Sequence, residues 1–258
     1  MKFDGVPRPD LDTLTRLHRG HVDNIVYENL DVQLGRTVTR RPLDIFDKIV
    51  TRHRGGWCYE MNGLLSWALG EIGFEVTHLA GGVMRAALGE AVVGNHLVLL
   101  VQLDRPYIAD VGFGDGLIEP VPLEQGPIRQ RRLRFQFEDL GQGWWRFHND
   151  PGGGAPSFDF EIKQADESLL DERCAWLQSD PQSPFVLNAV VQRHLPDGLA
   201  IMRGRTLKLL GAETTARNLS TADEYVETLT SVFGLTLPEA ASLWPKIVAR
   251  HRELFGEA

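Results

Sequence analysis

The stretch RGGWCYEMN, residues 54–62, contains one of only two cysteines in a chain of 258 residues. Apolar residues spaced three and four apart continue from it to Ile72, a pattern that predicts an amphipathic helix ending at Gly73. Cys58 would then lie at the amino end of that helix, where unpaired backbone N–H groups and the helix dipole favour the reactive thiolate. The two preceding glycines are expected to leave room for a substrate or an oxyanion. The alternative is an inert thiol packed in the core.

Two polar residues on neighbouring predicted strands are candidates for activating this thiol. A thiol nucleophile needs a base, and the base needs a group that orients it. His96 begins the predicted strand 96–103, and Asp110 lies in the next one, 106–113. An aspartate inside an apolar strand is costly unless it is paired. Each residue alone fits a structural role, at a strand edge or in a turn, but together beside a helix-start cysteine they favour a catalytic triad.

The loop between these strands decides whether His96 and Asp110 meet. Side chains alternate between the two faces of a strand. If residue 103 paired with 106, the two side chains would lie on opposite faces. If residue 102 paired with 106, they would be diagonal neighbours on one face. We therefore predict a loop with an odd number of residues, or a bulge, between the strands.

Three further polar features each have a plain structural alternative. His18 and His21 are three residues apart, but no matching ligands lie nearby, so we predict no metal site. The loop GFGDG (112–116) lacks the third glycine of a dinucleotide-binding fingerprint, although its backbone N–H groups are suited to meet a phosphate. Glu28 and Arg54 either form a buried ion pair that braces the cysteine loop or are two separate surface charges.

The composition argues against several classes of protein. The net charge of -8 disfavours nucleic-acid binding, although the arginines of RQRRLR (129–134) are candidate phosphate contacts. No apolar run reaches the ~18–20 residues that span a bilayer, and the first residues lack the apolar core of a signal peptide. Cys58 and Cys174 do not make a disulfide framework. We expect a cytoplasmic protein with reduced thiols that binds neither nucleic acid nor a membrane.

Three stretches differ in pattern and together predict an α+β fold. Residues 1–75 are mostly helical and include the cysteine. Residues 76–165 show the short alternating runs and turns of an antiparallel sheet. Residues 166–258 combine a strand with a pair of C-terminal helices.

These segments in combination resemble one family, the arylamine N-acetyltransferases. RGGWCYEMN fits the family motif R-G-G-x-C-x-E-x-N at every fixed position, and the order and approximate spacing of Cys, His and Asp also match. Four further segments are similar to parts of the family: HVDNIVYENLDVQLGR, NHLVLLV, YIADVGFGD and DPQSPFVLNAVVQR. Asn95 departs from the family pattern, in which many members have a threonine, and the linker from His96 to Asp110 looks about one residue short.

The resemblance implies a fold and a chemistry. The fold would be an N-terminal helical bundle (1–75), a central antiparallel β-barrel (76–165) and a C-terminal α/β lid (166–258), with a core like that of cysteine proteases and transglutaminases. Cys58 would be the acetyl-accepting nucleophile, His96 the base and acid, and Asp110 the orienting group. Four residues are expected to bind substrate: Gly112, Phe113, Gly114 and Phe185.

The implied reaction is N-acetylation of an arylamine or arylhydrazine by a ping-pong mechanism, with acetyl-CoA as co-substrate and no metal or bound cofactor. Three alternatives stay open. One is an amide synthase of the same family type that closes a macrolactam. Another is a cysteine hydrolase or transglutaminase-like acyltransferase, and the last is a CoA-binding or structural domain with an inert Cys58. The natural acceptor and the oligomeric state are left open.

Overall fold

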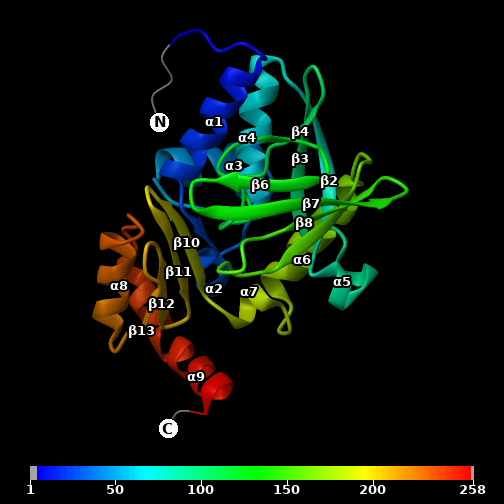
Figure 1. Ribbon diagram of the computed structural model, residues 1–258. Helices are drawn as coiled ribbons and strands as arrows, with labels where there is room; N and C mark the ends of the chain where they lie inside the picture. The colour runs from blue at the N-terminus through cyan, green and yellow to red at the C-terminus, as the bar shows by residue number, and fades with distance from the viewer. Residues whose placement is uncertain (1–4, 257–258) are drawn as a thin grey trace.

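The computed structural model of this protein describes residues 5–256, and helices dominate their first part (Figure 1). The elements there are α1 (Leu11–Asn24), α2 (Leu30–Gln33), α3 (Pro42–Phe46), the π-helical turn η1 (Asp47–Thr51) and α4 (Cys58–Ile72). Asp10 caps α1, because its side chain accepts the N–H of Thr13 at 2.9 Å. α4 ends as predicted, at Gly73 with a φ of 100° that suits glycine.

An eight-stranded antiparallel sheet follows, with strand order β5-β4-β3-β2-β9-β8-β7-β6. Its strands are β2 (Glu75–Val83), β3 (His96–Gln102), β4 (Pro106–Ile108), β5 (Val121–Pro122), β6 (Gly126–Gln130), β7 (Leu133–Gly141), β8 (Trp144–His148) and β9 (Ser157–Glu161). Two short helices, α5 (Arg85–Leu88) and η2 (Glu90–Val92), interrupt it. The structure thus shows a curled sheet where the family resemblance implied a barrel. The predicted strand 106–113 ends at Ile108, so Asp110 lies in the loop after β4.

A second antiparallel sheet joins the two ends of the chain. It has the order β1-β10-β11-β12-β13, built from β1 (Tyr27–Glu28), β10 (Val190–Leu195), β11 (Gly198–Arg203), β12 (Thr206–Leu210) and β13 (Thr215–Asn218). The helices of this part are α6 (Glu167–Ser179), α7 (Pro184–Leu187), α8 (Ala222–Ser231), the 3₁₀ helix η3 (Pro238–Leu243) and α9 (Trp244–Phe255). β1 also forms a bridge to Gly56, so the loop before Cys58 is attached to this sheet.

Two apolar cores hold these layers together. The larger one lies between the N-terminal helices and the eight-stranded sheet, where α4 packs against β2 and β3. It contains a group of packed phenylalanine rings from β7, β8 and β9, with Phe147 and Phe158 stacked at 4.9 Å between centroids. The smaller core joins the five-stranded sheet to α8, η3 and α9. The start of α4 and the amino end of β3 both border the larger core, which keeps water away from them.

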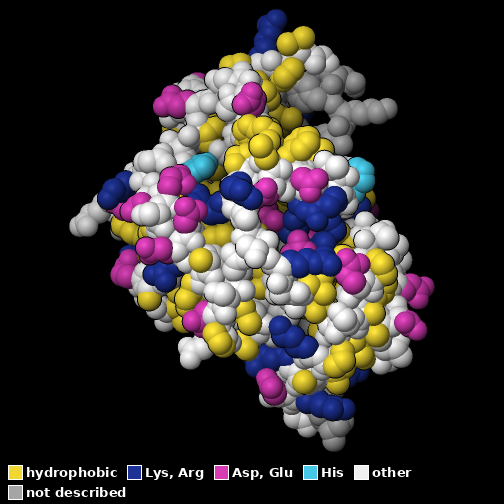
Figure 2. All heavy atoms as spheres, turned by 180° about the vertical axis from the view of Figure 1, so that it is seen from behind, with side chains coloured by type: hydrophobic (Ala, Val, Ile, Leu, Met, Phe, Trp, Pro, Cys, Tyr) yellow, Lys and Arg dark blue, Asp and Glu magenta, His cyan; other side chains and the backbone are white. Residues whose placement is uncertain are grey.

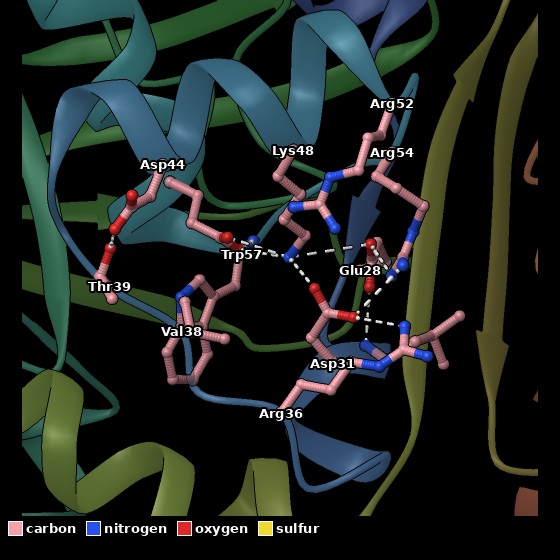
Figure 3. A network of polar contacts seen from close by, with 12 residues as sticks. Glu28, Asp31, Arg36, Val38, Thr39, Asp44, Lys48, Arg52, Arg54 and Trp57 are labelled. Carbon is pink, nitrogen blue, oxygen red and sulfur yellow. Dashed lines mark hydrogen bonds and ion pairs between the residues drawn. The ribbon is translucent and has the colours of Figure 1, made fainter.

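A cluster of buried charges braces the segment that leads into α4 (Figure 3). Arg54 lies 2.6 Å from the Glu28 carboxylate and 3.2 Å from Asp31, which confirms the predicted buried ion pair. Lys48 lies 3.1 Å from Asp31 and 2.9 Å from Glu60. Burial alone would lower the pKa of Lys48, but the three carboxylates outweigh burial and raise it. Lys48 therefore stays charged and ties η1 to α2 and α4.

Replacing Lys48 by Met should destabilise the fold strongly, because Asp31 and Glu60 would stay buried without this cation. We expect the free energy of unfolding to fall by roughly 3–5 kcal/mol, measured by urea denaturation at pH 7. The matched control is Arg41→Met. That change breaks an exposed pair with Asp44 and should cost less than about 1 kcal/mol. Equal losses in the two variants would contradict a stabilising role for the buried cluster.

Candidate active site

Cys58 is the first residue of α4 and is buried, with 1% of its surface exposed. Trp57 precedes it as the N-cap, and the N–H of Trp57 is accepted by the Glu60 carboxylate at 3.3 Å. The Cys58 thiol points towards the carbonyl oxygen of Asn95, 3.8 Å away, just before β3. The thiol is thus held between the start of α4 and the start of β3.

The glycines before Cys58 serve close packing, which corrects the expectation that they leave room for a substrate. A Cβ at Gly55 would lie 2.0 Å from the carbonyl oxygen of Val26, and one at Gly56 would lie 2.7 Å from the Cβ of Glu60. The space beside both glycines is therefore filled by the protein itself. The Gly-Gly pair lets this loop pass directly against β1 and the first turn of α4.

The register between β3 and β4 is the one that the triad requires. Gln102 pairs with Pro106 and Leu100 with Ile108, so a three-residue loop joins the strands. This confirms the predicted odd-length loop and places His96 and Asp110 on one side. The Nε2 atom of His96 lies 2.7 Å from Oδ2 of Asp110.

Asp110 receives three hydrogen bonds, and together they hold its carboxylate in one orientation. Besides the bond from His96, its Oδ1 accepts Nδ2 of Asn62 at 2.7 Å and the N–H of Gly112 at 2.8 Å. Burial alone would raise the pKa of Asp110, but His96, Asn62 and Gly112 outweigh burial and lower it. Asp110 is therefore a carboxylate.

His96 is 1% exposed, and its charge is set by its partners. Burial disfavours the imidazolium, but Asp110, together with a hydrogen bond to Cys58, outweighs burial and raises the pKa of His96 to about 10. Since Nε2 contacts Asp110, the other ring nitrogen is the one left for the thiol. This is the arrangement that a base needs to take a proton from sulfur and to return it.

Asn62 was not among the predicted site residues, although it closes the motif RGGWCYEMN. Its side chain joins three elements: Nδ2 donates to Asp110 and to the carbonyl oxygen of Leu97, and Oδ1 accepts the N–H of Val111 at 2.9 Å. Asn62 lies one helical turn after Cys58, on the same face of α4. This spacing could have pointed to Asn62 from the sequence, because a polar side chain buried on the same helix face as Cys58 needs a hydrogen-bond partner.

The structure brings two of the four predicted substrate-binding residues, Gly112 and Phe113, into contact with Cys58 or His96. Gly112 packs against Cys58, and a Cβ there would lie 2.8 Å from the Cys58 Cα. The Phe113 ring meets the His96 ring edge to face at 5.4 Å, and Gly114 lies against the Gln192 amide. Phe185 is further out, where it packs on the Trp57 ring at 5.1 Å. Phe113 therefore borders the site directly, whereas Phe185 reaches it only through Trp57.

A cleft of about 430 Å³ lies between β11, β12 and α9, with the glycine loop 153–154 on its rim. Its lining includes four basic residues: Arg203, Lys208, Lys246 and Arg250. Burial lowers the pKa of Lys246, and no other group offsets that shift. An anion bound beside it would relieve this cost. The cleft thus combines several cations with a volume that suits an anionic small molecule.

Residues 10–242 match the sequence model of a family described as N-acetyltransferase. The arylamine N-acetyltransferase of Mycolicibacterium smegmatis is 34% identical over 93% of this chain and 90% of its own length. The chain belongs to the arylamine N-acetyltransferase family. A crystal structure of the M. smegmatis enzyme superposes with a TM-score of 0.85, at 32% identity over 95% of this chain and 94% of that one. The structure of the Mycobacterium marinum arylamine N-acetyltransferase in complex with CoA superposes with a TM-score of 0.84, at 28% identity over 95% of this chain and 94% of that one. The family consists of acyltransferase enzymes.

Two expectations from the sequence concern metals and membranes. Within residues 5–256, no group of three or more His, Cys, Asp or Glu side chains is arranged to hold a metal ion. No helix in the same range is long and apolar enough to cross a membrane. His18 and His21 lie buried in α1. His18 Nδ1 is 3.0 Å from the carbonyl oxygen of Ile118, and His21 Nε2 is 3.5 Å from the Met61 sulfur.

Burial keeps both histidines neutral, lowering the pKa of His18 to about 4 and of His21 to about 3. An unfolded histidine titrates near 6.5, so between pH 6.5 and 4 the unfolded chain binds more protons than the native one. Stability should therefore fall as the pH drops, by roughly 2 kcal/mol for each histidine between pH 7 and pH 5. A His21→Gln variant should lose correspondingly less over that range in urea denaturation. Parallel pH profiles for the variant and the parent protein would contradict this account.

Proposed function

We propose that this chain transfers the acetyl group of acetyl-CoA to an arylamine or arylhydrazine through an S-acetyl intermediate on Cys58. The observation that carries the proposal is the buried contact of His96 with Asp110 at 2.7 Å, beside a cysteine at the start of a helix. Family membership supports acyl transfer, and the triad supplies its route.

In the first half-reaction, the raised pKa of His96 favours a proton on the imidazole rather than on Cys58, and the thiolate attacks the carbonyl carbon of the thioester. The oxyanion that forms is stabilised by the backbone N–H groups of Cys58 and Tyr59, because those of Glu60 and Met61 already donate to the carbonyl oxygen of Trp57. When the tetrahedral intermediate collapses, the bond to the CoA sulfur breaks and His96 returns the proton to that sulfur. The products are CoA and S-acetyl Cys58.

In the second half-reaction, the amine attacks the acetyl carbon and His96 takes a proton from its nitrogen. The bond to Cys58 breaks, the proton passes to the thiol, and the amide leaves. Aromatic amines suit this step because their low basicity keeps them neutral and nucleophilic at pH 7. Phe113, edge to face with His96, offers an apolar wall against which such a ring can pack.

The phosphates of CoA are proposed to occupy the basic cleft between β11, β12 and α9. Its four cations match a ligand with several negative charges, and its volume of about 430 Å³ lies in the usual range for small-molecule sites. Its lining also includes Gln33, whose side chain donates to the carbonyl oxygen of Val186 at 3.1 Å. Phe185, the residue before Val186, packs on Trp57, the neighbour of Cys58. These contacts connect the lining of the cleft with the residue next to Cys58.

Incubation with radiolabelled acetyl-CoA and no acceptor should leave one acetyl group on each protein, bound to sulfur. The label should be absent from Cys58→Ala and released by hydroxylamine, which cleaves thioesters. Asp110→Asn should keep the fold but lower the rate of acetylation by roughly two to four orders of magnitude, because His96 would lose its orienting charge. Circular dichroism of both variants provides the check on folding.

Two results of this experiment would count against the proposal. Label that persists in Cys58→Ala would show that the acetyl group is not carried by the Cys58 thiol. An unlabelled parent protein that still hydrolyses a peptide or ester at Cys58 would point instead to the cysteine hydrolase alternative.

Arg203→Met with Lys246→Met should raise the KM for acetyl-CoA by about tenfold or more and leave kcat nearly unchanged, since the lost contacts are equal in the ground and transition states. A truncated thioester without phosphates, such as an S-acetyl cysteamine derivative, should not distinguish this double variant from the parent. The matched control is Lys163→Met, an exposed lysine outside the cleft. If KM for acetyl-CoA is unchanged in the double variant, the phosphates lie elsewhere.

A further inference from the structure

The hairpin of β6 and β7 places two arginines directly opposite each other. Arg129 is the cross-strand partner of Arg134 in the antiparallel pair, and both side chains are exposed. Leu133 and Phe135, which flank Arg134 on β7, are buried, so the two arginines share the outer face. Like charges in direct cross-strand pairs destabilise a sheet. The native protein therefore carries a repulsive pair here.

Nothing in the described part of the chain neutralises this pair. Among residues 5–256, no carboxylate lies within 4.0 Å of the guanidinium of Arg129, Arg132 or Arg134, whereas Arg131 in the same hairpin pairs with Asp23 at 2.6 Å. The Asp150 carboxylate lies between these arginines and the second sheet, but both of its oxygens accept backbone N–H groups. Oδ2 accepts from Arg134 at 3.0 Å and Oδ1 from Gly152 at 2.8 Å. The three arginines thus present their charges to solvent together.

These arginines line a cavity between the hairpin and the second sheet. The cavity has a volume of about 390 Å³, and its opposite wall includes Gly198, Leu210 and Gly211, at the ends of β11 and β12. Figure 1 shows the β6–β7 turn reaching the end of β10, where Arg131 also donates to the carbonyl oxygen of Leu195 at 3.2 Å. The cavity shares no lining residue with the basic cleft beside α9.

We propose that this cavity, called the groove below, is a second anion site, which binds a small molecule carrying two or more linked phosphates. Guanidinium groups hold phosphate oxygens through paired hydrogen bonds, and three of them around one cavity match a chain of phosphates better than a single charge. The bound anion would offset the repulsion between Arg129 and Arg134. It would also tie the hairpin to the loop between β10 and β11. The proposal does not depend on acetyl transfer.

The test is calorimetric titration of the full chain with inorganic tripolyphosphate at low salt, in the presence of saturating CoA so that the cleft beside α9 is occupied. We expect one site on the parent protein and a loss of affinity of tenfold or more in Arg129→Gln with Arg134→Gln. Arg129→Lys, which keeps the charge, should bind within about threefold of the parent. The double variant Arg203→Met with Lys246→Met serves as a second control, because it should still bind tripolyphosphate.

A single charge reversal provides an independent readout. Arg134→Glu turns the repulsive pair into an attractive one, so it should raise Tm without phosphate and abolish the rise in Tm that tripolyphosphate gives the parent protein. Binding that is equal in the parent and in Arg129→Gln with Arg134→Gln would overturn the proposal. So would the absence of binding at millimolar tripolyphosphate both with and without CoA.

Titrations with ADP and with CoA separate the two sources of linked phosphates. If ADP binds while CoA is saturating, and this binding depends on Arg129 and Arg134, the ligand is a free nucleotide. If CoA itself loses affinity when these two arginines are changed, the groove holds phosphates of CoA. Either dependence supports the anion site, and independence from both arginines rules it out.

Discussion

The contact between the first turn of α4 and the loop after β4 is the constraint on which the candidate active site depends. Gly112 lies so close to Cys58 that a Cβ would come within 2.8 Å of its Cα. Because the loop sits this near, the Asn62 amide reaches both the Asp110 carboxylate and the N–H of Val111. The orientation of Asp110, and through it that of His96, follows from this one close approach. Rigid packing, with the polar groups satisfied, keeps the site ordered before any substrate arrives.

Charge is distributed unevenly between the inside and the surface of this protein. Inside, Lys48 and Arg54 are matched by Glu28, Asp31 and Glu60, so the segment before Cys58 is braced by attraction. Such a cluster gains little over apolar packing, but removing one member is costly, which makes it a device for holding one geometry. At the surface, side chains of both signs lie interspersed on the face drawn in Figure 2, and the cleft beside α9 and the groove beside β6 and β7 each collect several cations. In a chain with a net charge of -8, these two concentrations of positive charge are local features that the overall charge conceals.

The second sheet links the segment before Cys58 to the C-terminal half of the chain. β1 comes from the N-terminal region, yet it pairs with β10, with Tyr27 opposite Gln192. The same segment bridges to Gly56, two residues before Cys58. The C-terminal region therefore forms part of the frame around the cysteine loop, and the basic cleft lies on elements that are joined to that loop.

Local patterns in the sequence were enough to predict the α4 helix and its end at Gly73, the strand that begins at His96, and the odd-length loop that lets His96 meet Asp110. These features depend on periodicity, on turn length and on the cost of burying a charge, all of which are properties of short segments. The motif and its spacing also predicted the family, whereas the role of Cys58 as the nucleophile stays a prediction.

Only the tertiary structure decided how distant segments meet. It showed that Gly55 and Gly56 are needed because Val26 and Glu60 fill the space beside them, and that Asn62 joins α4 to Asp110. It also showed the curled sheet, the pairing of β1 with β10 and the opposition of Arg129 and Arg134. Local sequence patterns predict none of these features, since each depends on which atoms come within a few ångströms of one another after the whole chain has packed.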